Sequence, residues 1–99
     1  MSKYTNGANF ERKVIHYLME KGALFVMRGA GSKSYGNIKA DIVAFANNKV
    51  LIIQVKHSDK TSKKEEEEFM SNVTNELGNG FIPLWLTPKN WKELIDLVL

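Results

Sequence analysis

Two stretches rich in Ile and Val, residues 38–46 and 49–57, are separated only by Asn47-Asn48, and this pattern constrains the fold more than any other feature of the chain. Asparagine tolerates positive φ, as a two-residue hairpin turn requires, so the pattern predicts an antiparallel β-hairpin. Such a turn fixes the register, and the predicted cross-strand pairs are Val43 with Ile52, Asp41 with Gln54, and Lys39 with Lys56.

The two faces of this hairpin differ in polarity. Asp41, Gln54 and Lys56 share one face near its open end. The opposite face is apolar, so we expect it to pack on the core; it carries Ile38, Ala40, Ile42, Ala44, Leu51, Ile53 and Val55.

The rest of the chain predicts an α/β fold in the order α-β-β-β-α-β-α. Phe10, Val14, Tyr17 and Leu18 fall at helical spacing within residues 9–21, and the apolar run 23–28 predicts a strand, followed by a polar loop over residues 29–37. Ser62 with Glu65 resembles a capping box and opens a second helix, which ends at Gly78.

The last part of the chain predicts a strand over residues 81–86 and a final helix through Val98. Thr87 and Pro88 are a favourable N-cap and first-turn pair for this helix. The acidic run 65–68 is expected to be a solvated helix start rather than a metal site, because acidic residues in a first turn complement the helix dipole.

Composition excludes several classes of protein. The 99 residues suffice for one domain, residues 1–99, with one modest core. The absence of cysteine excludes disulfide scaffolds, cysteine-type zinc modules and thiol catalysis, and suits the cytoplasm. No apolar run approaches the length of a membrane span, so no membrane association is expected.

The charges are distributed unevenly. Residues 1–60 hold ten Lys or Arg and four Asp or Glu, whereas residues 61–99 hold four and seven. The basic part therefore comes first, which weakly favours a polyanionic partner.

The polar face of the hairpin carries a possible chemistry. A carboxylate and an amide oxygen side by side can share a hard cation such as Mg²⁺, and a neighbouring ammonium can orient an attacking water or stabilise charge on a phosphate. The alternative is an ordinary cross-strand ion pair between Asp41 and Lys56, with Gln54 filling space.

Four motifs resemble the archaeal-type Holliday junction resolvases of the PD-(D/E)xK nuclease superfamily. They are Phe10-Glu11-Arg12, the run from Arg28 to Ser32, the run from Ala40 to Ala44, and Ile53-Gln54-Val55-Lys56, and they cover nearly the whole chain in the family's order. The resemblance implies a restriction-endonuclease-like core with a central mixed sheet flanked by helices.

The resemblance also implies the site residues. Glu11, Asp41 and Gln54 would hold the metal, Lys56 would be the catalytic lysine, and Ser32 would lie near the scissile phosphate. The implied cofactor is Mg²⁺, with Mn²⁺ able to substitute. The residues expected to contact DNA are Arg12, Arg28, Lys33, Ser34 and Lys39.

The implied function is hydrolysis of DNA phosphodiesters at four-way (Holliday) junctions during recombination and repair. Such a junction needs two paired cuts, so we expect a homodimer; Phe81, Trp85 and the helix around Trp91 are candidate contacts, although each suits the core better.

Gln54 departs from the family pattern, which has Glu here. The neutral amide lowers the negative charge of the site and weakens Mg²⁺ binding. Mrr-like nucleases, which cut duplex DNA, resemble this chain in using QxK. Gln54 is also compatible with a junction-binding relative that does not cleave, or with an introduced Glu→Gln change.

Overall fold

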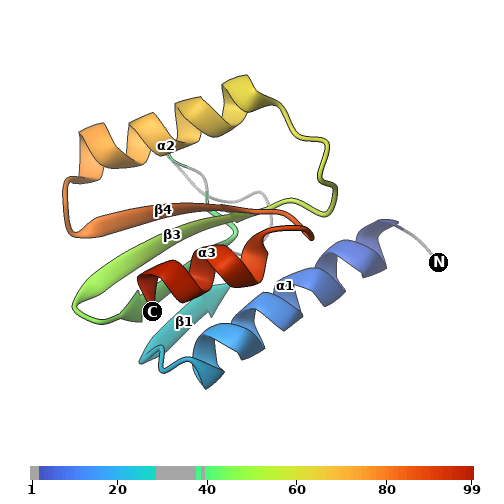
Figure 1. The fold of residues 1–99 in the computed structure, drawn as a ribbon, viewed down its shortest axis with the longest axis horizontal. Helices are drawn as coiled ribbons and strands as arrows, with labels where there is room; N and C mark the ends of the chain where they lie inside the picture. Colours follow the sequence, from blue (N-terminus) through green and yellow to red (C-terminus); the bar gives the residue numbers. More distant parts are fainter. Residues whose placement is uncertain (1–2, 29–37, 39) are drawn as a thin grey trace.

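The computed structural model describes residues 3–28, 38 and 40–99 and contains the predicted order of elements (Figure 1). Its helices are α1 (Lys3–Glu20), α2 (Lys63–Leu77) and α3 (Trp91–Val98). Its strands are β1 (Phe25–Arg28), β2 (Ile42–Ala46), β3 (Lys49–Val55) and β4 (Phe81–Leu86). The predicted α/β class and the succession α-β-β-β-α-β-α are therefore confirmed.

The four strands form one mixed sheet in the order β1-β2-β3-β4. β1 with β2 and β2 with β3 are antiparallel, whereas β3 and β4 are parallel. The parallel pair requires a crossover, which α2 supplies. Asn47 and Asn48 have φ values of 54° and 62°, so the predicted hairpin turn is confirmed, as is its register, with Val43 opposite Ile52.

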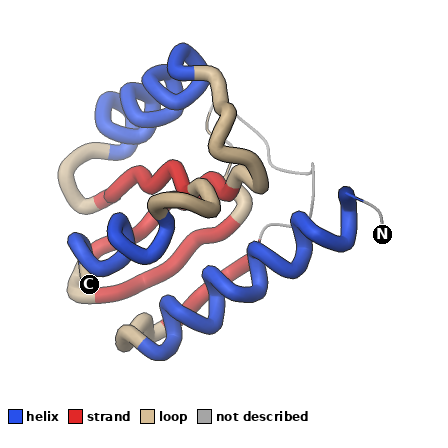
Figure 2. The backbone as a smooth tube through the Cα atoms, turned by 45° about the vertical axis from the view of Figure 1, so that its right-hand side comes forward, coloured by secondary structure: helices blue, strands red, loops and turns tan. Residues whose placement is uncertain are grey.

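Helices cover both faces of the sheet (Figure 2). On one face, α1 packs through the fully buried Val14 and Leu18, and α3 through Ile95, against a main core that includes Ile53 of β3. On the other face, α2 packs through Phe69 and Val73 against Ile52 and Trp85. The predicted core face is confirmed for Ile42, Ala44, Leu51, Ile53 and Val55. The alternate residues of β3 are also largely apolar, and α2 covers them.

The strand before the hairpin turn is shorter than predicted, because its alternation shifts by one residue at Asp41. The Asp41 N–H donates to the Ile53 carbonyl at 2.9 Å, although Ile42 is the residue paired with Ile53. Asp41 and Ile42 thus both lie opposite Ile53, as in a β-bulge. Ile38 and Ala40 consequently pack with the α2-side cluster instead of the main core, and the predicted Asp41–Gln54 pair is absent from the ladder of these described strands.

The two later helices begin differently. The Ser62 Oγ accepts from the Glu65 N–H at 3.3 Å, which confirms the predicted N-cap of α2. The predicted start of the last helix at Thr87-Pro88 is wrong, since α3 begins at Trp91. The Thr87 N–H donates to the Asn90 side-chain Oδ1 at 3.0 Å and closes a turn ahead of the helix.

Candidate functional site at the end of strand β3

A cavity of about 180 Å³ lies between the end of β3 and α2. Gln54 and Lys56 both line it, which confirms that they share a face of the sheet. Alternation along β3 produces this, because Gln54 continues the stripe of Val50 and Ile52 that faces α2. The remaining lining residues are Ile38, Glu65, Glu68, Phe69, Asn72 and Trp85.

Trp85 holds the Lys56 side chain in a defined place. The Lys56 Nζ lies 4.8 Å from the centre of the Trp85 ring, within the range of a cation–π interaction. The ring itself is only 4% exposed, and its Nε1–H donates to the Thr61 Oγ1 at 3.2 Å. Phe69 packs against it with ring centres 5.8 Å apart. The lysine therefore rests on a surface that is fixed on two sides.

Asp41 lies just before β2, and its carboxylate is tied to β3. The Asp41 Oδ2 accepts from the Val55 N–H at 2.8 Å. Val55 lies between Gln54 and Lys56, so this bond attaches the carboxylate to the segment that carries both of those residues. The alternative, an ion pair between Asp41 and Lys56, is wrong for these two described residues. Asp41 accepts from the Val55 N–H, and Lys56 lies over the Trp85 ring.

Glu11 and Arg28 form an ion pair between α1 and β1. The Arg28 Nε donates to the Glu11 Oε1 at 3.0 Å, and the Glu11 side chain is 24% exposed. A predicted metal ligand and a predicted DNA contact are thus joined, which the sequence pattern did not indicate. Glu11 is absent from the residues lining the cavity of Gln54 and Lys56.

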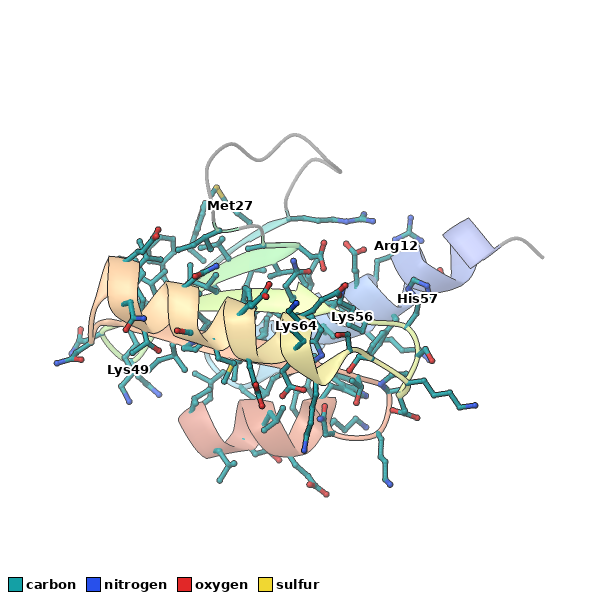
Figure 3. All side chains as sticks on the ribbon, turned by 90° about the horizontal axis from the view of Figure 1, so that it is seen from above. Arg12, Met27, Lys49, Lys56, His57 and Lys64 are labelled. Atoms are coloured by element: carbon teal, nitrogen blue, oxygen red, sulfur yellow. The ribbon has the colours of Figure 1, made fainter. Side chains whose placement is uncertain are left out.

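The other predicted residues are placed less fully. Arg12 is exposed on α1, at the end of the molecule where Lys56 and His57 lie and away from Lys49 at the hairpin turn (Figure 3). Ser32, Lys33, Ser34 and Lys39 lie outside the described residues.

Two carboxylates in the cavity were missed by the sequence reasoning. Glu65 and Glu68 were expected to be solvated, and both are exposed, yet they line the cavity with Gln54. Their spacing contained the signal: with Phe69 and Asn72 they follow the helical stripe i, i+3, i+4, i+7, and Phe69 is the core-facing residue of that stripe.

Among the described residues, no three His, Cys, Asp or Glu side chains gather into a group that could hold a metal ion. The predicted ligand set, two carboxylates and the amide of Gln54, does not contain three such side chains. Carboxylate and amide oxygens are nevertheless the donors that Mg²⁺ accepts, and it needs few from the protein. The chemistry of Asp41 and Gln54 therefore fits this ion.

No helix among the described residues is long and apolar enough to cross a membrane. No curated protein matches the chain significantly. The family model described as archaeal Holliday junction resolvase (Hjc), a family with the restriction-endonuclease-like fold, matches residues 2–91. This match covers most of the chain, includes all four sequence motifs, and agrees with a mixed sheet that places Gln54 and Lys56 at one strand end. The chain therefore belongs to the archaeal Holliday junction resolvase family.

Proposed function

We propose that this protein is a structure-selective endonuclease that cuts four-way DNA junctions by metal-dependent hydrolysis of phosphodiesters. One observation carries the proposal: in a chain of the resolvase family, Gln54 and Lys56 line one cavity, and the Asp41 carboxylate is bonded to the residue between them. The proposal treats residues 1–99 as one nuclease domain and places it in the cytoplasm.

Asp41 and Gln54 are the residues that would hold Mg²⁺ here, with Glu11 as a third donor. A carboxylate has about four acceptor positions, so the bond from the Val55 N–H leaves Asp41 able to bind a cation. Bound Mg²⁺, or Mn²⁺ in its place, would lower the pKa of water and neutralise charge on the phosphate. The bond from Arg28 uses one oxygen of Glu11, so Glu11 likewise keeps acceptor positions for a cation.

Lys56 would act on the phosphate as a fixed cation. Its ammonium lies over the Trp85 ring, so its position is set before DNA arrives. A preorganised charge next to the scissile phosphate stabilises the developing negative charge without reorganisation during the reaction. Trp85, held by Thr61, is then a positioning residue for Lys56.

Contacts to the DNA backbone would come from Arg12, Lys33, Lys39 and the serines Ser32 and Ser34. Phosphate contacts give affinity without base preference, which suits recognition of a branched shape. Arg28 is available to phosphate when it exchanges Glu11 for DNA.

Two paired cuts need two sites, so the proposal includes a homodimer. Trp85 is buried in the core, which removes it from the candidate contacts. The part of the sheet that carries β1 and β2 offers a better surface: Phe25, Met27 and Phe45 are 51%, 50% and 39% exposed, and the rings of Phe25 and Phe45 lie 5.8 Å apart. Exposed apolar patches of this kind mark interaction sites.

A Mg²⁺ titration of junction cleavage, comparing the wild-type protein with Gln54→Glu, tests the assigned metal position. The added carboxylate should lower the Mg²⁺ concentration needed for half-maximal cleavage, because the site gains a negative charge. An unchanged Mg²⁺ requirement would remove Gln54 from the ligand set. Equal cleavage of a linear duplex would favour an Mrr-like duplex nuclease, and binding with no cleavage by either protein would favour a junction-binding protein.

A further inference from the structure

A second cavity, of about 400 Å³, opens on the other side of the same strand end. It is lined by Asn9, Phe10, Lys13, His57, Pro88 and Trp91. Phe10 and Trp91 pack against the main core, whereas the lining of the first cavity includes Phe69 and Trp85 of the α2-side cluster. Lys56 lines the first cavity and the next residue, His57, lines the second, so the two cavities meet at one short segment after β3.

The lining of the second cavity combines hydrogen-bond donors with aromatic surfaces. Lys13 and His57 are exposed, and Asn9 adds an amide. Phe10 and Trp91 are half-buried and meet edge to face with ring centres 5.7 Å apart, so they form a rigid wall. No carboxylate appears among these described lining residues, in contrast to Glu65 and Glu68 in the first cavity.

This chemistry selects a ligand with both an anion and a planar ring. Inorganic phosphate would use Lys13 and His57 but leave the rings without a partner. A nucleotide uses both, because its phosphate accepts hydrogen bonds from Lys13 and His57 and its base stacks on aromatic side chains, as in proteins that bind single strands. The volume is within the range of pockets for small ligands.

We propose that this cavity binds one unpaired deoxynucleotide of the DNA strand that enters the candidate active site. The inference rests on the proposed function, since it takes the strand to be that of a branched DNA. A base next to a branch point is unpaired at lower cost than a base within a continuous duplex, so the cavity would favour branched over linear DNA. Lys13, His57 and the Phe10–Trp91 wall then become specificity residues for branch structure.

NMR of the ¹⁵N-labelled protein tests the proposal without any cleavage assay. Thymidine 5′-monophosphate should shift the Trp91 indole N–H and the His57 signals saturably, and inorganic phosphate should bind at least about tenfold more weakly. Lys13→Ala and His57→Ala should each weaken the nucleotide by about tenfold, as expected for loss of a charge-assisted hydrogen bond. Lys49→Ala is the matched control, because Lys49 is also exposed and lies at the far hairpin turn (Figure 3).

Three results would overturn the proposal. Equal binding of phosphate and nucleotide would show a simple anion patch. Shifts spread over the surface, weakened equally by Lys49→Ala, would show nonspecific attraction. Binding of the free nucleotide with exclusion of pentathymidylate would show that the ligand is not part of a strand, whereas tighter binding of pentathymidylate at the same residues supports the proposal.

This test is independent of the proposed function. If the protein cleaves junctions but nucleotides cause no shifts at the cavity residues, only the nucleotide site is refuted. A cavity that binds pentathymidylate in a protein that ignores junctions would refute the junction nuclease and leave the nucleotide site standing.

Discussion

Replacing Asp41 with Ala or with Asn should separate its structural role from its catalytic role. The Asp41 Oδ2 is the acceptor for the Val55 N–H, which is part-buried. Alanine removes this acceptor, and an unsatisfied buried donor costs about 1–3 kcal/mol. Because the bond is only part-buried, we expect a loss of about 1–2 kcal/mol in the free energy of unfolding. For a domain of this size, that lowers the Tm by about 4–16 °C.

Asparagine keeps an oxygen in the same place and should cost less than about 1 kcal/mol, since a neutral acceptor replaces a charged one. Both variants should lose metal-dependent cleavage, because both remove the negative charge. A destabilised Asp41→Ala protein and a nearly native Asp41→Asn protein would thus fail in cleavage for the same reason.

Urea unfolding gives the stabilities, and amide hydrogen exchange reports the Val55 N–H directly. Exchange at Val55 should accelerate in Asp41→Ala and change little in Asp41→Asn. Asp59→Ala is a matched control: the Asp59 Oδ1 accepts from the Lys89 N–H at 3.0 Å, but in an exposed position where water replaces it. Equal stability of Asp41→Ala and the control would refute the structural role assigned to this carboxylate.

Three further predictions concern other contacts. Thr61→Val removes the acceptor of the Trp85 Nε1–H and should slow single-turnover cleavage by about threefold to tenfold with unchanged junction affinity; an unchanged rate would show that Trp85 does not position Lys56. The hydrogen bond from Tyr17 holds the pKa of Asp96 below its ordinary value, so the stability that it adds is present above the unfolded-state pKa and is lost as pH falls through the folded-state pKa. Asp96→Asn should therefore lower the urea midpoint more at neutral pH than in acid below the folded-state pKa, and a loss that is the same at every pH would contradict this linkage. Phe45→Lys should shift the protein from dimer to monomer in sedimentation analysis while its circular dichroism spectrum stays that of a folded protein, and a persistent dimer would exclude the β1–β2 surface.

The hairpin shows how far local sequence chemistry determines this fold. Asn47 and Asn48 adopt the positive φ that the turn requires, and the register follows from the turn length as far as Ile42 and Ile53. The register fails at Asp41, because a side chain that competes with the backbone for the Val55 N–H replaces one ladder bond. Strand periodicity does not reveal where a side chain takes the place of a backbone acceptor.

Only the part of the site that lies within one strand was predicted from the sequence. Gln54 and Lys56 share a face because alternation within one strand is a local property. The contacts of Glu11 with Arg28 and of Lys56 with Trp85 join elements that are far apart in the chain, so no spacing rule indicates them. The turn ahead of α3 is closed by another side-chain contact, in which the Asn90 Oδ1 accepts from the Thr87 N–H.

The catalytic role of Lys56 is best tested by single-turnover cleavage of a labelled four-way junction in Mg²⁺, by the wild-type protein and by Lys56→Ala. The wild-type protein should make paired cuts near the branch. Lys56→Ala should cleave at a rate at least about a hundredfold lower, with junction affinity little changed, since one preorganised charge is lost. Equal cleavage rates, or junction binding without cleavage by the wild-type protein in both Mg²⁺ and Mn²⁺, would contradict this role.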